Sequence, residues 1–322
     1  METRSIYSGI FLAVLVSLVG ARADTIVFNA DYESGALDSG ITGLDATQAT
    51  APDAALVSTA YARSGTYSIY HKVTLDDPAY VSAGKPRSES DTSGVSSTLY
   101  RSGDHAIYTF SVLLKDWQDW SSGATPIDIV WQFKHTNGSP DAFVGVRRNQ
   151  LVLRYGASDQ VVLVNDIRPF DNKWIDLKFD IFWSDLTNGY IKAWVSANGA
   201  PLTRVANIAN YATYSGGTGN FGYLKWGLYR PDSTSANGAV MTREAHHDNI
   251  SVTVVPPPLR MDFQSGQYTL AWPNPSPGFL LQTSPDLSAW SNVTTQSVVV
   301  GSENQVTVPA SEERGFFRLI RP

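Results

Sequence analysis

The sequence contains no cysteine among its 322 residues. A chain of this length without disulfides must be held together by packing, or by packing together with a metal ion. Charged residues make up only 17% of the chain, and the formal net charge is −6. General nucleic-acid binders and proteins of anionic membrane surfaces usually carry a basic excess, so the composition argues against both classes. A local cationic surface on this acidic chain would therefore stand out.

Long hydrophobic runs are also missing, except near the amino terminus. There Arg4 precedes an uncharged apolar run from Ile10 to Val19, which is followed by Ala21-Arg22-Ala23. The run is shorter than the roughly 20 apolar residues that span a bilayer, and its layout is typical of a secretory signal peptide. We therefore predict a signal peptide over residues 1–23 and no membrane span. The expected protein is a bacterial one, secreted to the extracellular space or the periplasm.

A sustained helical period is absent as well. Short segments of alternating apolar and polar residues recur instead, separated by clusters of Gly, Asn, Asp, Ser and Pro. In the segment from Trp174 to Phe182, for example, four apolar residues alternate with Asp176, Lys178 and Asp180. About nine segments of this kind predict an all-β fold, a two-sheet β-jelly-roll sandwich of the concanavalin-like type.

Three consecutive prolines, Pro256–Pro258, interrupt this pattern and indicate a stiff connector. We place the main β domain at residues 24–254, the connector at 255–259 and a small C-terminal β-sandwich module at 260–322. The module resembles those appended to bacterial secreted enzymes, whose usual roles are attachment to a glycan or retention at a cell surface. Its sequence does not identify a ligand.

Three segments place polar and aromatic side chains on one face of an extended strand, since side chains of a strand alternate between its two faces. The residues expected on the polar side are Tyr223, Lys225 and Tyr229 in one segment, Gln132 and Lys134 in another, and Lys85, Arg87 and Glu89 in the third. The residues expected on the apolar side are Leu224, Trp226 and Leu228, and Ile129, Trp131 and Phe133. Arg230 falls on the apolar side and is expected to be a rim or structural cation. Each segment alone can be an ordinary solvated face, but together they predict one cationic surface that also bears an amide and phenols.

These segments carry a resemblance to a known family. Arg87-Ser88-Glu89, the Gln132-x-Lys134 strand and the stretch from Tyr223 to Tyr229 are similar, in order and spacing, to the three signature strands of jelly-roll polysaccharide lyases. That group includes the alginate, heparin-lyase-I-like, glucuronan and ulvan lyases, and the resemblance spans Thr25 to Val254. It implies β-elimination at a uronic acid of an acidic polysaccharide. The Gln-x-Lys form looks more like the ulvan and glucuronan branch, so these substrates come first and alginate next.

The resemblance also implies roles for the residues. Tyr229 matches the family's catalytic tyrosine by position, and Arg87 and Gln132 suit neutralisation of the substrate carboxylate. Lys134 is a further catalytic candidate. The expected substrate-binding residues are Lys225, Tyr223, Glu89 and Lys85. A phenol has a pKa of about 10 in water, and nearby cations are expected to stabilise the Tyr229 phenolate and to lower the pKa of Lys134. No cofactor is required for this chemistry.

The sequence departs from the alginate-lyase pattern, in which the second strand reads Gln-x-His. Here His135 comes one position later than that pattern requires, and a shift by one residue turns a side chain to the other face of the strand. A β-bulge would restore His135 to the face of Gln132, so both Lys134 and His135 stay open as catalytic candidates.

Oxygen-bearing residues near both ends of the main domain resemble the calcium sites of related sandwiches. Asn29, Asp31 and Glu33 lie near the mature amino terminus, and Asp248 lies in the last strand of the domain. Carboxylate and amide oxygens suit calcium, so a structural Ca²⁺ site is predicted, with plain surface as the alternative. The adjacent His246 and His247 point to opposite faces of a strand, which argues against joint ligation of a metal.

Two other functions compete with the lyase. A glycoside hydrolase needs two carboxyl groups that face each other across the bond, but Glu33, Glu89 and Glu244 are scattered along the main domain. A noncatalytic lectin-like protein for acidic glycans is the stronger rival, because a cationic, aromatic surface binds such glycans without cutting them. The expected placement of Tyr229 and Lys134 near Gln132 and Arg87 favours the lyase.

Overall fold

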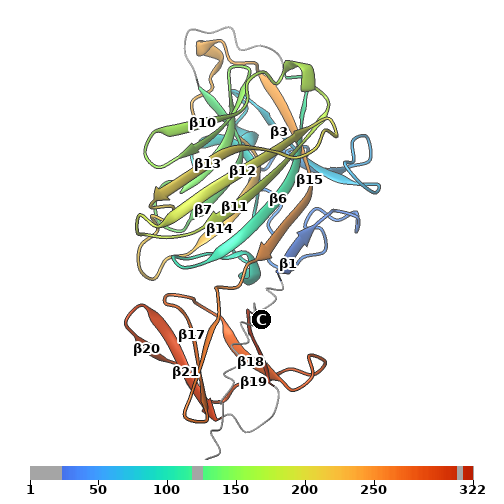
Figure 1. The fold of residues 1–322 in the computed structure, drawn as a ribbon. Helices are drawn as coiled ribbons and strands as arrows, with labels where there is room; N and C mark the ends of the chain where they lie inside the picture. Colours follow the sequence, from blue (N-terminus) through green and yellow to red (C-terminus); the bar gives the residue numbers. More distant parts are fainter. Residues whose placement is uncertain (1–23, 118–125, 310–314, 322) are drawn as a thin grey trace, which may run out of the picture.

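A computed structural model describes residues 24–117, 126–309 and 315–321. The signal peptide predicted for residues 1–23 lies outside the described residues. Figure 1 shows a larger β-sandwich and, beyond the end of β15, a smaller β module. The described residues are almost entirely strands, loops and short turns, which confirms the all-β prediction.

The larger unit is a sandwich of two antiparallel sheets. The eight-stranded sheet has the order β13 (Thr203–Tyr211), β12 (Gly189–Ala197), β11 (Trp174–Phe182), β6 (His105–Lys115), β15 (Thr242–Val254), β3 (Ser68–Thr74) and β2 (Ala55–Ser58), with β1 (Thr25–Ala30) also paired to β15. The seven-stranded sheet has the order β10 (Asp159–Val164), β9 (Gln150–Tyr155), β8 (Ala142–Arg147), β7 (Ile127–His135), β14 (Gly222–Tyr229), β5 (Lys85–Asp91) and β4 (Val81–Ser82). The described helical turns are η1 (Pro78–Tyr80), η2 (Ser96–Thr98), η3 (Arg168–Phe170) and η4 (Ser235–Asn237).

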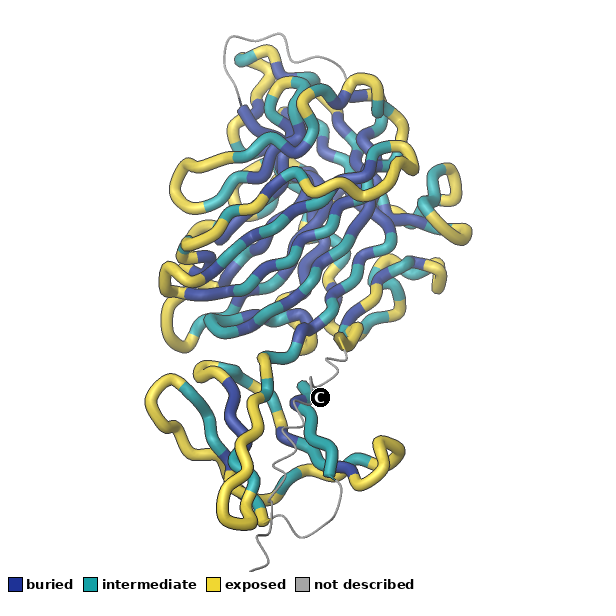
Figure 2. Tube along the Cα trace, viewed as in Figure 1, coloured by how far each residue is buried: buried dark blue, intermediate teal, exposed yellow. Residues whose placement is uncertain are grey.

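The core lies between these two sheets, where buried residues run along the central strands (Figure 2). The rings of Phe110 on β6 and Trp131 on β7 stack with their centroids 3.9 Å apart, and Trp226 on β14 stacks on Trp131 at 5.9 Å. The indole nitrogen of Trp226 donates a hydrogen bond of 3.0 Å to the hydroxyl of Tyr32, so its polar atom is satisfied in the core. Truncating one of these tryptophans to alanine would cost about 3–5 kcal/mol.

A β-bulge interrupts the pairing of β7 with its neighbours. The register shifts between Ile129 and Trp131, so that Ile129 leaves the core and packs beside Tyr229 on the outer face. Val130 and Trp131 both lie in the central core. The expectation that Ile129 shares the face of Trp131 is therefore wrong, because the extra residue reverses the alternation at this point.

Gly227 lies opposite Glu89, within the stretch of β14 where this register shifts, and has a φ of +137°. A Cβ added there would lie 2.4 Å from the carbonyl oxygen of Ser88 and 2.8 Å from the Cγ of His71. Only glycine fits, because the backbone of β5 and a core histidine occupy the space that a side chain needs.

The smaller module begins after the proline-rich connector, since β15 ends at Val254 and β16 starts at Arg260. One of its sheets has the order β16 (Arg260–Gln264), β17 (Gln267–Pro273), β21 (Glu303–Pro309) and β20 (Val298–Val300), and the other has the order β19 (Ser291–Asn292), β18 (Leu280–Ser284) and β22 (Phe316–Ile320). It has its own small core around Leu270 and Trp272. Arg321 joins it to the larger unit, with an ion pair of 2.8 Å to Asp104.

Among the residues that the structure describes, no helix has the length and apolar character needed to cross a membrane.

Candidate active site

The three strands with two-sided patterns lie side by side in the seven-stranded sheet, in the order β7, β14, β5. Tyr229 pairs with Arg87, Gly227 with Glu89, Lys225 with both Asp91 and Gln132, and Tyr223 with Lys134. Leu224, Trp226 and Leu228 lie in the core, so Tyr223, Lys225 and Tyr229 are on the outer face. The structure therefore brings most of the predicted catalytic and binding side chains to one face of one sheet, with His135 and Lys85 as exceptions.

Glu89 lies at the centre of this group and is only 4% exposed. It accepts a short hydrogen bond from Nε2 of Gln132, and Nζ of Lys225 lies 3.1 Å from its Oε2. A buried carboxylate is tolerated only when it is paired and hydrogen-bonded, and here residues from β7 and β14 supply both. Gln132 and Lys225 are themselves buried. Glu89, predicted to bind substrate, is thus placed to orient residues from two neighbouring strands.

Arg87 is less tightly engaged by this carboxylate. Its Nη1 lies 3.9 Å from Oε2 of Glu89, and its buried Nε has no hydrogen-bond acceptor among the described residues. Because Lys225 already balances Glu89 at a shorter distance, the charge of Arg87 is left available. Its side chain is half-buried, so an anionic ligand on this face can reach it.

The guanidinium of Arg87 lies over the ring of Tyr229, with its central carbon 4.1 Å from the ring centroid. Burial raises the pKa of the Tyr229 hydroxyl above its usual value of 10, and Glu89 and Asp232 raise it further, while Arg87 lowers it. Cations were expected to stabilise the phenolate. Arg87 has this effect, but burial and the two carboxylates outweigh it, so the pKa of Tyr229 is raised and the hydroxyl is protonated near neutral pH.

Lys134 lies on the outer face opposite Tyr223. Its Nζ donates to the carbonyl oxygen of His135 at 2.8 Å and also to that of Gly138. Burial lowers the pKa of Lys134, and the charge of Lys225 lowers it further. Burial raises the pKa of Tyr223 to about 12, with help from Asp91 and Glu89.

Lys134 and Tyr229 are at opposite ends of the group. Tyr223, the partner of Lys134, precedes Tyr229 by six positions on β14, which corresponds to roughly 20 Å of strand. The Lys134 ammonium also turns back toward the loop after β7. The backbone positions of the two residues are therefore well separated along β14, although Arg87, which contacts the Tyr229 ring, also contributes to lowering the pKa of Lys134.

His135 is buried on the core side of β7 and does not reach the outer face. Its Nε2 lies 3.2 Å from Oγ of Ser215 and 3.8 Å from Oδ1 of Asp141, and its side chain is 4% exposed. Burial lowers the pKa of His135. The pairing of β7 with β14 is regular between Trp131 and His135, and the bulge lies nearer the start of the strand, between Ile129 and Trp131. His135 as a catalytic candidate is therefore wrong, because no bulge reverses its face.

Lys85 lies at the exposed start of β5, away from the Glu89 group. Its Nζ donates a hydrogen bond of 2.8 Å to the carbonyl oxygen of Pro231, in the loop that follows β14. Arg230, beside Tyr229, is fully buried, and its Nε lies 3.3 Å from Oδ1 of Asp128. Arg230 is thus a structural cation rather than a rim residue, and it fixes the end of β14 next to Tyr229.

Two of the residues proposed to bind calcium, Glu33 and Asp248, instead accept hydrogen bonds from backbone amides of this chain. Both carboxylate oxygens of Glu33 accept hydrogen bonds from the backbone amide of Thr66. The carboxylate of Asp248 accepts hydrogen bonds from the backbone amides of Arg63, Ser64 and Asn249. Asn29 donates to Asp31 at 3.1 Å. In the part of the chain that the structure describes, no three His, Asp or Glu side chains are grouped to hold a metal. As placed, Asn29, Asp31, Glu33 and Asp248 do not fit a shared cation site, and calcium binding stays a prediction.

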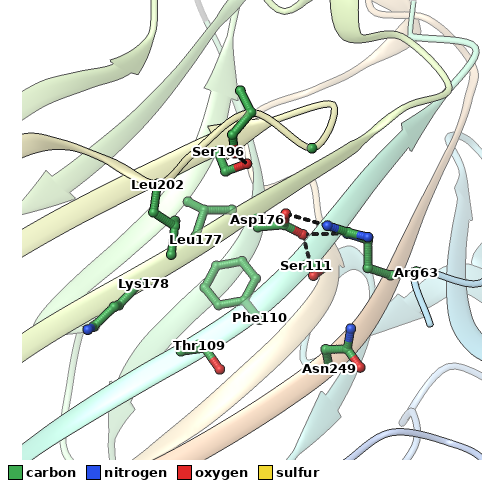
Figure 3. Close-up of a pocket in the computed structure, with 12 residues that line it drawn as sticks. Arg63, Thr109, Phe110, Ser111, Asp176, Leu177, Lys178, Ser196, Leu202 and Asn249 are labelled. Atoms are coloured by element: carbon green, nitrogen blue, oxygen red, sulfur yellow. Dashed lines mark hydrogen bonds and ion pairs between the residues drawn. The ribbon is translucent and has the colours of Figure 1, made fainter.

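A pocket of about 380 Å³ lies on the outer face of the other sheet, over β6, β11 and β12 (Figure 3). Arg63 and Asp176 face each other in it through two hydrogen bonds of 2.8 and 2.9 Å, and Ser111 donates to the same carboxylate. None of the predicted site residues lines this pocket. Its acid and its base neutralise each other, and Lys178 also lines the pocket, with its Nζ 5.3 Å from the centroid of the Trp194 ring.

The sequence alone did not indicate that two further residues lie on the outer face beside the predicted site. Phe143 on β8 pairs with Gln132, and Arg154 on β9 pairs with Phe143. Their strands were recognisable from alternation, but the pairing that places them beside Gln132 is tertiary and leaves no local pattern.

Comparison with solved structures bears on the fold first. An endo-β-1,4-glucuronan lyase from the fungus Trichoderma reesei has 21% identity and a TM-score of 0.51 over 71% of this chain and 95% of its own. The catalytic domain of a glycoside hydrolase family 131 protein from Coprinopsis cinerea has 12% identity and a TM-score of 0.50 over 70% and 93%. A PL-14 alginate lyase from Aplysia kurodai has 13% identity and a TM-score of 0.45 over 71% and 98%. At these identities the likeness shows the fold alone, which is a jelly-roll sandwich.

The sequence identifies the family. Residues 37–251, about two thirds of the chain, match the profile of the family described as polysaccharide lyase. This chain belongs to that family and is a polysaccharide lyase. No curated protein matches it with significance.

Proposed function

We propose that this lyase cleaves a uronic acid-containing polysaccharide by β-elimination and leaves unsaturated uronate ends. Glucuronan and ulvan are the first candidates as substrates, and alginate is the next. The observation that carries the proposal is the contact between Arg87 and Tyr229 on a half-buried face, with Glu89 already neutralised by Lys225. That arrangement leaves one cation and one phenol for an incoming sugar.

Arg87 supplies the first requirement of the reaction. The proton on C5 of a uronate becomes acidic only when the neighbouring carboxylate is neutralised, because the charge that develops on removal of the proton spreads into that group. A guanidinium binds a carboxylate through two parallel hydrogen bonds, and the unpartnered Nε of Arg87 is a donor for one of them. Lys225 and Gln132 support Arg87 indirectly by holding Glu89.

Tyr229 supplies the second requirement. In a β-linked glucuronate, the C5 proton and O4 are on the same face of the ring, so a single group can serve both. The Tyr229 phenolate takes the C5 proton, the electron pair of that C–H bond forms the C4–C5 double bond, and the C4–O4 bond breaks. The new phenol then protonates O4, and the phenolate is restored.

A second candidate centre is the pair of Lys134 and Tyr223. The environments of these two groups push their pKa values apart, with lysine lowered and tyrosine raised, and such a divergence is typical of a base and its acid. Two carbonyl oxygens accept hydrogen bonds from Lys134 Nζ, so a neutral amine there would keep its lone pair for a substrate. We assign this pair to substrate binding, and the comparison of the two tyrosines described below distinguishes the alternatives.

The remaining parts of the proposal concern location and attachment. We propose that the protein is secreted through its amino-terminal segment and that the C-terminal module attaches to a glycan or a cell surface. No cofactor takes part in the proposed steps.

The test is a substrate panel. Purified protein is incubated with glucuronan, ulvan, alginate and heparin, and the unsaturated uronate is followed by its ultraviolet absorbance. We expect product from glucuronan or ulvan. Binding to acidic glycans without product from any of them would replace the lyase reaction with the lectin-like alternative.

A further inference from the structure

A row of paired residues crosses the outer face of the seven-stranded sheet. Lys225 on β14 pairs with Gln132 on β7, Gln132 with Phe143 on β8, and Phe143 with Arg154 on β9. Neighbouring strands are about 4.8 Å apart, so Arg154 lies roughly 10 Å from Gln132 in the direction perpendicular to the strands. A glycan that crosses the strands at the Glu89 group would continue over this row.

Phe143 and Arg154 are both on the outer side of their strands. The neighbours Ala142 and Leu153 lie in the central core, so alternation turns Phe143 and Arg154 the other way. Phe143 packs against the small outer cluster of Ile129 and Val152, which Tyr229 also contacts. Phe143 and Arg154 are half-buried, so each keeps part of its surface for a ligand.

Arg154 has no hydrogen-bond or ion-pair partner among the described residues. The side chains of Arg148 and Arg204 also lack one but are exposed, and Arg101 lies over the ring of Phe221. Arg63 and Arg230 pair with aspartates, and Arg147, on the same face as Arg154, donates to Gln160 at 3.4 Å. A guanidinium is matched to planar or tetrahedral anions through its fixed fork of donors. A half-buried arginine without an acid therefore has its full donor set available.

We infer that Arg154 and Phe143 form a second anion-binding subsite, which holds the acidic group of a sugar residue at a distance from the bond that is cleaved. The inference rests on the proposed function, because it assumes that the substrate lies across β14, β7, β8 and β9. The guanidinium pairs with the acidic group, and the Phe143 ring packs against the apolar face of the sugar. The acidic group is a carboxylate in a polyuronate or a sulfate in a sulfated polymer, and both suit the same donors.

The test measures binding and turnover separately. Dissociation constants for glucuronan and ulvan are measured by calorimetry in the Tyr229→Phe background, where cleavage is expected to be slow, with Arg154→Ala or Arg154→Gln added. Arg204→Ala is the matched control, because Arg204 is an exposed arginine on β13 of the other sheet. A charge-assisted hydrogen bond is worth enough that its loss should weaken binding about tenfold to a hundredfold. Thermal melting checks that each variant is folded.

The outcomes separate this inference from the proposed function. Weaker binding of glucuronan by both Arg154 variants identifies a carboxylate ligand, and a loss confined to ulvan identifies a sulfate; either result supports the subsite. If wild-type protein binds these glycans but releases no unsaturated product, the proposed reaction fails while the subsite stands. If the Arg154 variants bind both polymers as tightly as Arg204→Ala does, or if no acidic glycan binds at all, the subsite is overturned.

Discussion

Lys225 Nζ lies 3.1 Å from the carboxylate of Glu89, and both residues are almost completely buried. The pair joins β14 to β5, and Gln132 adds β7 to the same carboxylate. One acid therefore fixes the relative positions of three strands that carry the proposed chemistry. It also acts on Tyr229 through space, because its charge raises the pKa of that phenol.

Glu89→Gln keeps the shape of the side chain and removes its charge. We expect the free energy of unfolding to fall by about 3 kcal/mol, because Lys225 is left buried without its partner. We also expect the pKa of Tyr229 to fall, so that the pH–rate profile shifts toward lower pH, which a purely structural defect would not produce. Urea unfolding and initial rates between pH 6 and 11 measure both effects.

Asp91→Asn is the matched control for that variant, because Asp91 lies 4.0 Å from the same Nζ. Its effects should be smaller in both measurements. If the two variants lost the same stability and shifted the pH–rate profile equally, Glu89 would not be the main partner of Lys225 or the main acid acting on Tyr229.

Tyr229→Phe removes one oxygen from the proposed acid and base. We expect kcat to fall about 10²- to 10⁴-fold, the usual contribution of such a group, with little change in binding. Tyr223→Phe is the control, since it loses the same atom on the same face of the same strand, and it should retain most of its kcat. The opposite result would move the reaction centre to Lys134 and Tyr223.

The wild-type rate should depend on pH through Tyr229. Its pKa is raised above the usual value of 10, and only the phenolate removes the C5 proton. Below that pKa the phenolate fraction grows with pH, so kcat/KM should increase about tenfold per pH unit toward the alkaline range. A profile that is flat between pH 7 and 10 would contradict Tyr229 as the base.

Lys134→Ala and His135→Ala distinguish neighbouring residues on opposite faces of β7. Lys134→Ala should raise KM about tenfold and leave stability nearly unchanged. His135→Ala should lower the free energy of unfolding by about 2 kcal/mol, because it leaves a cavity beside the buried Asp141, while the folded fraction keeps its kcat. Steady-state kinetics and chemical unfolding of each variant test these expectations, and loss of kcat in His135→Ala with stability intact would contradict them.

Acid should destabilise the sandwich through its buried histidines. Burial lowers the pKa of His71 from 6.5 to about 4, and that of His247 moves in the same direction. Between these values the unfolded chain binds more protons than the folded one, so the free energy of unfolding falls as pH decreases from 6.5 toward 4. The loss from His71 alone is roughly 3 kcal/mol.

The measurement is urea unfolding at intervals across that range, with His71→Gln as the comparison. The variant cannot be protonated, so its stability should vary less with pH than that of the wild type. Identical slopes for the two proteins would show that His71 is not responsible.

Local alternation in the sequence was sufficient to predict the all-β fold and the outward side of β14, because a strand has a strict period of two and its apolar side must be buried. The same rule placed Lys134 and Gln132 on one face of β7. It failed at Ile129, where a bulge adds a residue, since bulges depend on the neighbouring strands. The sequence alone could not predict the separation of Lys134 from Tyr229 along the sheet, because that separation follows from the pairing of Tyr223 with Lys134. The ion pairs of Glu89 and Asp128, and the position of Arg154 beside Phe143, depend on the same long-range strand pairing.

Gly227 has a consequence for mutational scanning of this enzyme. It lies two positions from Tyr229 and opposite Glu89, yet the atoms that exclude a side chain there are the Ser88 carbonyl and the His71 ring, on the side of the core. Any substitution at Gly227 would displace β5 and with it Arg87. A screen that scores only lost activity would therefore rank Gly227 with Tyr229, although one position is limited by space and the other is proposed to transfer a proton. Intolerance to substitution along β14 maps the fit between the two sheets as much as it maps the chemistry.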